Sequence, residues 1–294
     1  MTASVLEDLQ SRCGVGRLSK LTDFQVHFWG VRGSIACPGT ENTRYGGNTS
    51  CIEIRCGEKL LIFDAGTGIR NLAKKLVSSD NLELDLFLTH THFDHVSGFP
   101  FFSPVYRTDT KLQIWSGHLL PDRKIEQVLG SVMMDPLWPV QLEHLVADIQ
   151  FNDFSAGDTL ELTKEIRIRT ARLNHPNGAT GYRIEYGGRS ICYVTDTEHL
   201  PDRLDETVIE LIKDADIFIY DCMYTDDEYP NHVNWGHSTW QEGVKLANHA
   251  LVKQFVAFHH EPDHDDRMMD SIAEALLDAR PDSLVAREGM TLWV

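Results

Sequence analysis

The feature that most constrains this chain is a run of metal-binding residue types at the end of an apolar segment. Residues 90–95 have the sequence HTHFDH, and they follow the apolar segment 84–88, which has the length of a strand. Three imidazoles and a carboxylate packed this closely would be costly to desolvate without a bound cation. They are also the donors that zinc and similar metals take from proteins. The pattern predicts that a buried strand ends here in a loop that forms the floor of a metal site.

The number of donors favours two ions over one. A catalytic zinc ion takes about three protein ligands and keeps one position open for water. Residues 90–95 alone supply four donors. Further donors follow other apolar segments of strand length; these are Asp64, Asp196, Asp221 and His259. Because ligands bind at the carboxyl ends of strands in layered α/β proteins, we expect these donors to converge on one pocket.

Length and composition fit one large domain with a substantial core. The chain has 294 residues, of which 42% are hydrophobic, and no linker rich in Pro, Gly or Ser divides it. Residues 1–22 lack periodicity and are interpreted as an N-terminal arm, so that residues 23–294 form a single domain. Strands are expected to dominate residues 24–64 and 158–195, with a hairpin turn at residues 187–189. Helices are predicted at 69–78, 121–133, 203–214, 239–251 and 266–279.

The charge of the chain limits its partners. The formal net charge of −17 argues against a protein that holds long nucleic acid over a broad basic face. Small substrates are favoured, including anionic ones, because bound cations dominate the field inside a site. No apolar run reaches the roughly 20 residues of a spanning helix, and the start lacks a signal peptide, so a cytoplasmic protein without membrane contact is predicted. The six cysteines show no CxxC pair and are expected to be reduced and mostly structural.

The ordered motifs resemble those of the metallo-β-lactamase fold superfamily. The likeness is to its phosphodiesterase branch, which includes the tRNA 3′-end endonuclease and cyclic-nucleotide phosphodiesterases, and it covers about residues 24–294. It implies an α/β fold, a four-layer αββα sandwich of two mixed sheets flanked by helices. The five motifs that carry it follow one another in the expected order: Asp64, residues 90–95, His175, Asp196 and His259.

When the superfamily's ligand positions are matched to residues of this chain, the resemblance implies two divalent ions. Zinc is favoured, with manganese or iron as alternatives. One ion would be held by His90, His92 and His175, and the other by Asp94, His95 and His259, with Asp196 as the bridge. Asp64 would orient a ligand imidazole by a hydrogen bond without binding metal itself. For the last ligand the sequence also offers His260; His259 is preferred because it directly ends the strand.

A further likeness lies in residues 236–239, with the sequence GHST. In the tRNA-processing branch a similar segment carries a histidine that contacts the scissile phosphate, which makes His237 a catalytic candidate. The alternative is that Ser238 and Thr239 only cap a helix, and both roles are compatible because a helix N-terminus binds phosphate. That branch has a Glu in a motif ahead of this helix where the present chain has Asp221, whose role is left open.

Other candidate contacts are less specific. Arg32, Asn48, Ser238 and His260 are the candidate substrate contacts, and Arg32 could instead be a solvated turn residue. The aromatic and apolar segment 99–140 either lines a pocket for a flat group or belongs to the core or a lid. The long basic arm with which the tRNA-processing branch holds its substrate is missing.

The predicted activity is hydrolysis of a small nucleotide or cyclic-nucleotide phosphodiester. In this hypothesis a metal-bridging hydroxide attacks phosphorus, Asp94 and Asp196 hold and orient it, and His237 stabilises charge or protonates the leaving oxygen. The alternatives are a hydrolase of a lactone, thioester or β-lactam, and a non-catalytic nucleotide- or metal-binding protein on the same fold. A flavin-linked reductase is disfavoured, because such members usually carry Glu in place of His92. A homodimer is expected only by analogy with relatives.

Overall fold

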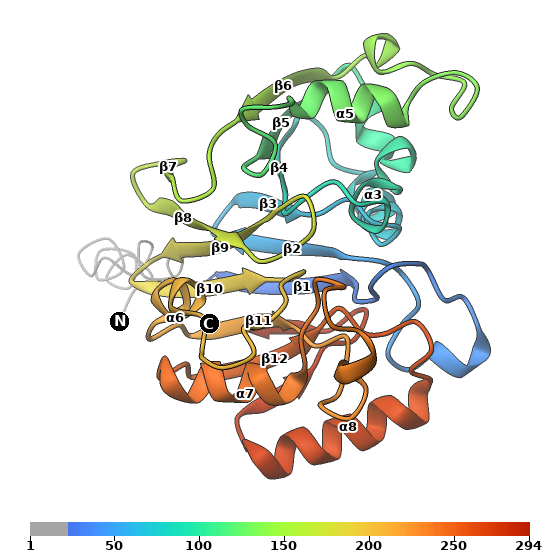
Figure 1. Ribbon diagram of the computed structural model, residues 1–294. Helices are drawn as coiled ribbons and strands as arrows, with labels where there is room; N and C mark the ends of the chain where they lie inside the picture. The colour runs from blue at the N-terminus through green and yellow to red at the C-terminus, as the bar shows by residue number, and fades with distance from the viewer. Residues whose placement is uncertain (1–22) are drawn as a thin grey trace, which may run out of the picture.

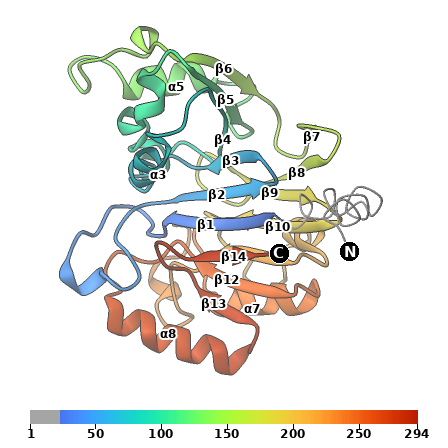
Figure 2. The ribbon, with the colours of Figure 1, turned by 180° about the vertical axis from the view of Figure 1, so that it is seen from behind.

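The computed structural model describes residues 23–294, so the predicted arm at residues 1–22 lies outside the described residues. Within 23–294 the strands form two mixed sheets of seven strands each. The sheets pack face to face, and helices cover both outer faces, as Figures 1 and 2 show from opposite sides. This architecture is the predicted four-layer αββα sandwich. The assignment of residues 23–294 to a single domain stays a prediction.

The first sheet joins the two ends of the described chain. In sheet order its strands are β14 (Thr291–Trp293), β1 (Phe24–Gly30), β2 (Cys51–Cys56), β3 (Lys59–Phe63), β4 (Leu82–Leu88), β5 (Thr110–Ser116) and β6 (Asp148–Asp153). Pairing is antiparallel from β14 to β3 and parallel from β3 to β6. The C-terminal β14 lies beside β1 at the edge of the sheet (Figure 2).

The second sheet repeats this plan. In sheet order its strands are β13 (Ser283–Val285), β12 (Gln254–Phe258), β11 (Ile217–Asp221), β10 (Arg189–Val194), β9 (Ala179–Tyr186), β8 (Ile166–Leu173) and β7 (Thr159–Glu161). Pairing is antiparallel from β7 to β10 and parallel from β10 to β13. The predicted hairpin joins β9 to β10, and its glycines Gly187 and Gly188 have positive φ of 60° and 77°, which glycine adopts at little cost.

The helices lie on the outer faces because each has one apolar stripe. In α3 (Ile69–Leu76) the buried residues recur at Ile69, Leu72, Ala73 and Leu76, the spacing of one helix face. The first sheet is covered by α3 and α5 (Ile125–Val132), and the second by α6 (Glu206–Ile212), α7 (Trp240–His249) and α8 (Asp266–Ala279) (Figure 1). A single turn, α4 (Phe93–Val96), lies inside the HTHFDH loop.

Two predicted helices are shorter than expected at their N-termini. The helix predicted at 121–133 begins at Ile125, because Lys124 is still extended with φ −118° and ψ 150°. The helix predicted at 203–214 begins at Glu206, because the Asp205 carboxylate caps it by accepting hydrogen bonds from the next turn. The helix predicted at 266–279 has the bounds of α8.

The central hydrophobic layer fixes how the two sheets face each other. Phe63 at the end of β3 contacts Tyr182 of β9 and Tyr193 of β10, with ring centroids 5.2 and 6.0 Å apart. All three side chains are fully buried. The contacts lie at the strand ends that carry the predicted metal donors, so the packing of this layer also sets the distance between donors from different sheets. None of the helices in residues 23–294 has the length and apolar character needed to cross a membrane.

Candidate metal centre

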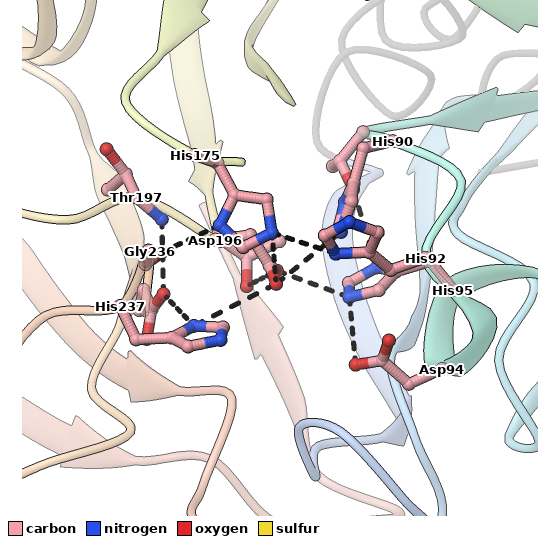
Figure 3. Close-up of polar contacts among 12 residues, drawn as sticks. His90, His92, Asp94, His95, His175, Asp196, Thr197, Gly236 and His237 are labelled. Carbon is pink, nitrogen blue, oxygen red and sulfur yellow. Dashed lines mark hydrogen bonds and ion pairs between the residues drawn. The ribbon is translucent and has the colours of Figure 1, made fainter. Parts of the chain in front are cut away.

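The predicted donors meet at one edge of the sandwich. Those from the first sheet follow β3 and β4, and those from the second follow β8, β10 and β12. The parallel strands of each sheet end side by side, so side chains far apart in sequence become neighbours, as predicted. Figure 3 shows the side chains of His175 and Asp196 from the second sheet pointing toward those of the HTHFDH loop from the first.

One group of donors consists of three imidazoles. His175 Nε2 lies 3.0 Å from His92 Nδ1, and the His90 ring packs edge-on against both rings. The carboxylate of Asp196 completes this outer group, with its Oδ1 3.7 Å from His90 Nε2 and 3.8 Å from His175 Nε2. His90 is buried, whereas His92 and His175 are partly exposed. The outer group therefore has access to solvent.

A second group is richer in carboxylates and fully enclosed. His95 Nε2 lies 3.3 Å from both Asp94 Oδ2 and His259 Nε2. The other oxygen of Asp196, Oδ2, lies 3.2 Å from His95 Nε2 and 3.3 Å from His259 Nε2. All four side chains of this inner group are buried. Asp196 thus presents one oxygen to each group.

The arrangement fits bound ions on two independent grounds. Tetrahedral zinc with Zn–N bonds of ~2.0–2.1 Å holds its ligand atoms ~3.3 Å apart. The two inner imidazole nitrogens lie 3.2–3.4 Å from each other and from the oxygens of Asp94 and Asp196. His90 Nε2 is buried without a hydrogen-bond partner, although it faces Asp196. A buried ring nitrogen normally has a partner. A cation between His90 and Asp196 would satisfy it.

The electrostatics of the inner group also call for positive charge. Burial lowers the pKa of His95, but the carboxylates of Asp196, Asp94 and Asp64 outweigh burial and hold this pKa well above its usual value. Burial would raise the pKa of Asp94, yet the neighbouring imidazoles, His95 first, hold it below its usual range. In the outer group, by contrast, burial lowers the pKa of His90 and keeps it a neutral donor. The inner carboxylates therefore favour a cation where the donor atoms converge.

The outward-facing nitrogens of the ligand rings are held by hydrogen bonds. His95 Nδ1 lies 2.9 Å from Asp64 Oδ2, a contact through which Asp64 would orient this imidazole. Asp64 in turn accepts hydrogen bonds from the Thr89 backbone N–H at 2.8 Å and from the Tyr193 hydroxyl at 2.9 Å. His175 Nδ1 lies 2.8 Å from the Gly236 carbonyl oxygen and donates a hydrogen bond to it. In both rings Nε2 faces the other donors and would be the atom that binds a metal.

Three of these residues share an uncommon backbone conformation. Asp64, Asp196 and His259 have φ of 61°, 59° and 60°. L-residues seldom adopt this left-handed region, although Asp and His enter it more readily than most. Each residue follows the end of a strand, and the conformation turns the chain sharply out of the sheet. All three turns lie at the edge of the sandwich where the predicted donors meet.

His237 lies beside both donor groups and is paired with a carboxylate. Its Nδ1 is 2.9 Å from Asp221 Oδ2 and 3.9 Å from Asp196 Oδ1, and Figure 3 shows it next to Asp196. Asp221 is itself fixed by the backbone N–H groups of Thr197 and Met223. Burial lowers the pKa of His237, but the Asp221 carboxylate outweighs it and raises the pKa to about 9. The role of Asp221 was left open by the sequence, and the structure pairs this residue with His237.

Arg32 does not contact the site, and the prediction that it could reach a phosphate is wrong. Its side chain is fully buried. Nε donates to the Gly46 carbonyl at 2.9 Å, and Nη1 donates to the carbonyls of Glu261 and His264 at 2.9 and 2.8 Å. Nη2 donates to Asn42 Oδ1 at 3.1 Å. With its donors occupied, Arg32 ties loops together rather than binding an anion.

The other predicted substrate contacts are also structural. Ser238 is fully buried, and its hydroxyl accepts from Tyr220 Oη at 3.0 Å, while the cap of α7 is Thr239, which accepts from the Glu242 N–H. The Asn48 amide donates to Glu288 Oε2 at 2.9 Å. His260 is buried with Nε2 2.9 Å from the Ala286 carbonyl, so His259 rather than His260 joins the donors. These contacts depend on distant segments, which a local pattern does not reveal.

The segment 99–140 is divided between the core and the lining of a pocket: residues 118–128 contribute His118, Leu119, Asp122, Arg123 and Val128 to a groove that His92 and His175 also line. Phe99, Phe102 and Met133 are fully buried beneath the first sheet's helices. Phe101 and Leu137 stay 53% and 75% exposed. Two residues that support the candidate ligands through Asp64, Tyr193 and Thr89, were not predicted from the sequence. Nothing in the sequence distinguishes a tyrosine that supports a carboxylate from one that only fills the core.

Comparisons with known proteins agree with the fold and the donor set. Residues 60–260, well over half of the chain, match the family model described as the beta-lactamase superfamily domain. Ribonuclease Z of Haloarcula marismortui is 24% identical over 287 residues, which cover 80% of this chain and 85% of that protein.

Two solved structures share the fold. The metallo-beta-lactamase fold protein YhfI of Bacillus subtilis has a TM-score of 0.69 and 17% identity, covering 92% of this chain and 99% of its own. A diphosphatase of the PhnP family has a TM-score of 0.67 and 16% identity, covering 92% and 97%. The resemblance inferred from the ordered motifs is confirmed: the chain belongs to the beta-lactamase superfamily.

Proposed function

We propose that this chain is a hydrolase with two divalent metal ions that cleaves phosphodiesters. The observation that carries the proposal is the position of Asp196, whose two oxygens face two different donor groups. The pairing of His237 with Asp221 beside this bridge adds a residue suited to proton transfer. Similarity to Ribonuclease Z over 80% of the chain supports a phosphodiester as the bond that is cleaved.

The residues that would hold the ions are His90, His92 and His175 for one, Asp94, His95 and His259 for the other, and Asp196 for both. Nitrogen and carboxylate donors favour zinc, with manganese or iron as alternatives. When bound, a pair of ions at such a site activates water and neutralises charge at phosphorus.

The chain's own residues then have separate tasks. Asp94 and Asp196 orient the attacking water, because their oxygens lie among the donors of the inner group. His237 gives a proton to the leaving oxygen or stabilises its charge. Asp221 holds the His237 ring in position through Nδ1, which leaves Nε2 for the substrate.

The substrate class follows from the charge of the molecule. A net charge of −17 gives little attraction for long nucleic acid. We therefore propose a small nucleotide or cyclic nucleotide as substrate, although the Ribonuclease Z relatives are named for RNA. A proton-transferring pair would also serve a carbonyl hydrolase, so the choice of a phosphodiester is supported by the similarity to Ribonuclease Z.

The test is a substrate panel with protein stripped of metal and reloaded with Zn²⁺, Mn²⁺ or Fe²⁺. We expect turnover of bis(p-nitrophenyl) phosphate and of cyclic nucleotides, and none of a lactone or thioester. The Asp196→Ala variant, purified in parallel, controls for contaminating hydrolases. Activity only on the carbonyl compounds would overturn the proposal, and so would tight nucleotide binding without turnover under any of the metals.

The role of His237 can be separated from metal binding. His237→Ala should lower kcat by about 10²-fold while the metal content measured by mass spectrometry stays unchanged. Asp221→Asn should give part of this loss, because the ring keeps its place but loses its carboxylate. His249→Ala removes an exposed histidine of α7 and is the matched control. Loss of metal together with turnover in His237→Ala would make His237 a structural residue.

A further inference from the structure

A groove opens beside the outer donors, and none of the inner residues Asp94, His95 and His259 lines it. It has a volume of about 730 Å³, and its lining includes His92 and His175 together with Arg123 and Arg172. This volume lies in the range of small-molecule sites, ~300–1,000 Å³. The groove is continuous with the partly exposed half of the candidate metal centre, so a molecule bound at the outer donors would extend into it.

The two arginines of this groove come from different elements. Arg172 lies near the end of β8, three positions before His175, and Arg123 lies in the loop before α5. The guanidinium of Arg172 passes over the turn that follows His175, because a Cβ added at Gly178 would lie 3.3 Å from Arg172 Nη2. Its charge therefore lies over this turn, in the groove that His175 also lines.

Neither guanidinium has a hydrogen bond or ion pair within residues 23–294. Three other arginines at the surface pair with carboxylates: Arg44 with Asp270, Arg167 with Glu161 and Arg169 with Glu210. Among the described residues, Arg70, Arg203 and Arg267 are exposed without an ion pair, but none of them lines this groove. The chain has 44 acidic and 27 basic side chains, so carboxylates are plentiful. Arg123 and Arg172 differ from those arginines because both unpaired guanidiniums line one groove beside the outer donors, which suits a ligand that brings its own negative charge.

The rest of the lining does not compete for this charge. His118 lies 3.1 Å from both Thr91 Oγ1 and Ser116 Oγ, so its ring nitrogens are engaged within the protein. Asp122 is the one carboxylate among the lining residues of this groove that the structure describes. Two guanidiniums against one carboxylate leave the groove cationic.

We infer that this groove binds a second phosphate of the substrate, distinct from the phosphate that would lie at the metal donors. The guanidinium fork matches the oxygens of a phosphate and makes charge-assisted hydrogen bonds to it. The inference rests on the proposed function and narrows its substrate class to phosphodiesters that carry another phosphate. That phosphate is either the terminal monoester of a nucleotide or the next linkage of an oligonucleotide.

The test compares two chromogenic substrates that differ only in this phosphate. They are the p-nitrophenyl ester of thymidine 5′-phosphate and the same ester with a 3′-phosphate. Arg172→Ala should lower kcat/KM for the 3′-phosphorylated ester by about tenfold or more and leave the plain ester within about twofold. Arg172→Lys should restore part of the loss, and Arg123→Ala should act in the same direction. Arg267→Ala, which removes an exposed arginine of α8 without an ion pair, is the matched control.

The source of the second phosphate is read from a third substrate, a short oligoribonucleotide without terminal phosphate. A loss confined to the 3′-phosphorylated ester assigns the groove to a terminal phosphate, and a loss on the oligoribonucleotide assigns it to a chain linkage; either supports the inference. Equal losses on the plain and phosphorylated esters, or losses no larger than in Arg267→Ala, would overturn it.

A binding measurement separates failure of this inference from failure of the proposed function. Adenosine 3′,5′-bisphosphate should bind the wild type more tightly than AMP does in calorimetric titrations, and Arg172→Ala should abolish the difference. If no phosphodiester is turned over but this difference is present, the proposed function fails while the phosphate groove stands. If phosphodiesters are turned over and the difference is absent, the groove assignment fails alone.

Discussion

The two halves of the candidate metal centre differ in how the protein encloses them. The inner group, Asp94, His95 and His259, is buried and is backed by the carboxylate of Asp64. The outer group is built from imidazoles, two of them partly exposed, and one of its rings is held by a backbone carbonyl instead of a carboxylate. Greater negative charge and burial favour tight retention of a bound ion. Access to solvent favours exchange of the ion and its contact with substrate. We therefore expect a permanent inner ion and an exchangeable outer ion.

The largest effect is expected where the two halves meet. Asp196→Ala removes an oxygen from both groups, so metal content should fall from about two ions per chain to fewer than one, and turnover should fall on the order of 10³-fold. Mass spectrometry of the metal and kinetics on bis(p-nitrophenyl) phosphate measure the two quantities. Retention of both ions would show that Asp196 is not the bridge.

The next largest effect distinguishes the halves directly. His95→Ala leaves three buried carboxylates without their imidazole, and should lower the free energy of unfolding by ~3–5 kcal/mol as well as removing the inner ion. His92→Ala removes a partly exposed donor and should release the outer ion with little change in stability. Chemical denaturation and metal analysis of both variants provide the comparison. Equal destabilisation by the two changes would contradict an inner–outer division.

The smallest effect tests the support behind the inner group. Tyr193→Phe removes the hydroxyl that donates a hydrogen bond to Asp64. It should weaken binding of the inner ion by about tenfold without affecting the outer ion. Tyr182→Phe is the matched control, because this buried hydroxyl donates to the Leu88 carbonyl and not to Asp64. Competition with a chromophoric chelator measures both affinities. A similar loss in the two variants would reduce Tyr193 to a packing role.

The donors could be predicted from the sequence because their chemistry is local and their placement follows a general rule. Residues 90–95 carry several donors within one loop, and the others each follow an apolar segment, where parallel strands bring their ends together. His259 was preferable to its neighbour because it directly ends its strand, and the structure places it among the donors.

The residues around the donors could not be predicted in the same way. Arg32 between glycines looks like an exposed turn residue, but its partners Glu261 and His264 come from the other end of the chain. Whether an arginine is saturated by carbonyls or left free, as Arg172 is, depends on which loops surround it after folding. Helix starts such as that of α5 depend equally on local backbone geometry that periodicity does not reveal.

The left-handed backbone of Asp64, Asp196 and His259 has a consequence for how this protein can change. Such a conformation costs each L-residue of order 1–3 kcal/mol, and glycine would relieve that cost while deleting the side chain. At Asp64 that relief is offset, because the Thr89 N–H and the Tyr193 hydroxyl would lose their buried acceptor. Glycine at Asp196 or His259 should thus trade catalysis for thermostability. A related protein that no longer catalyses a reaction could gain thermostability by these substitutions. Glycine at these positions would therefore indicate a relative that has lost the activity.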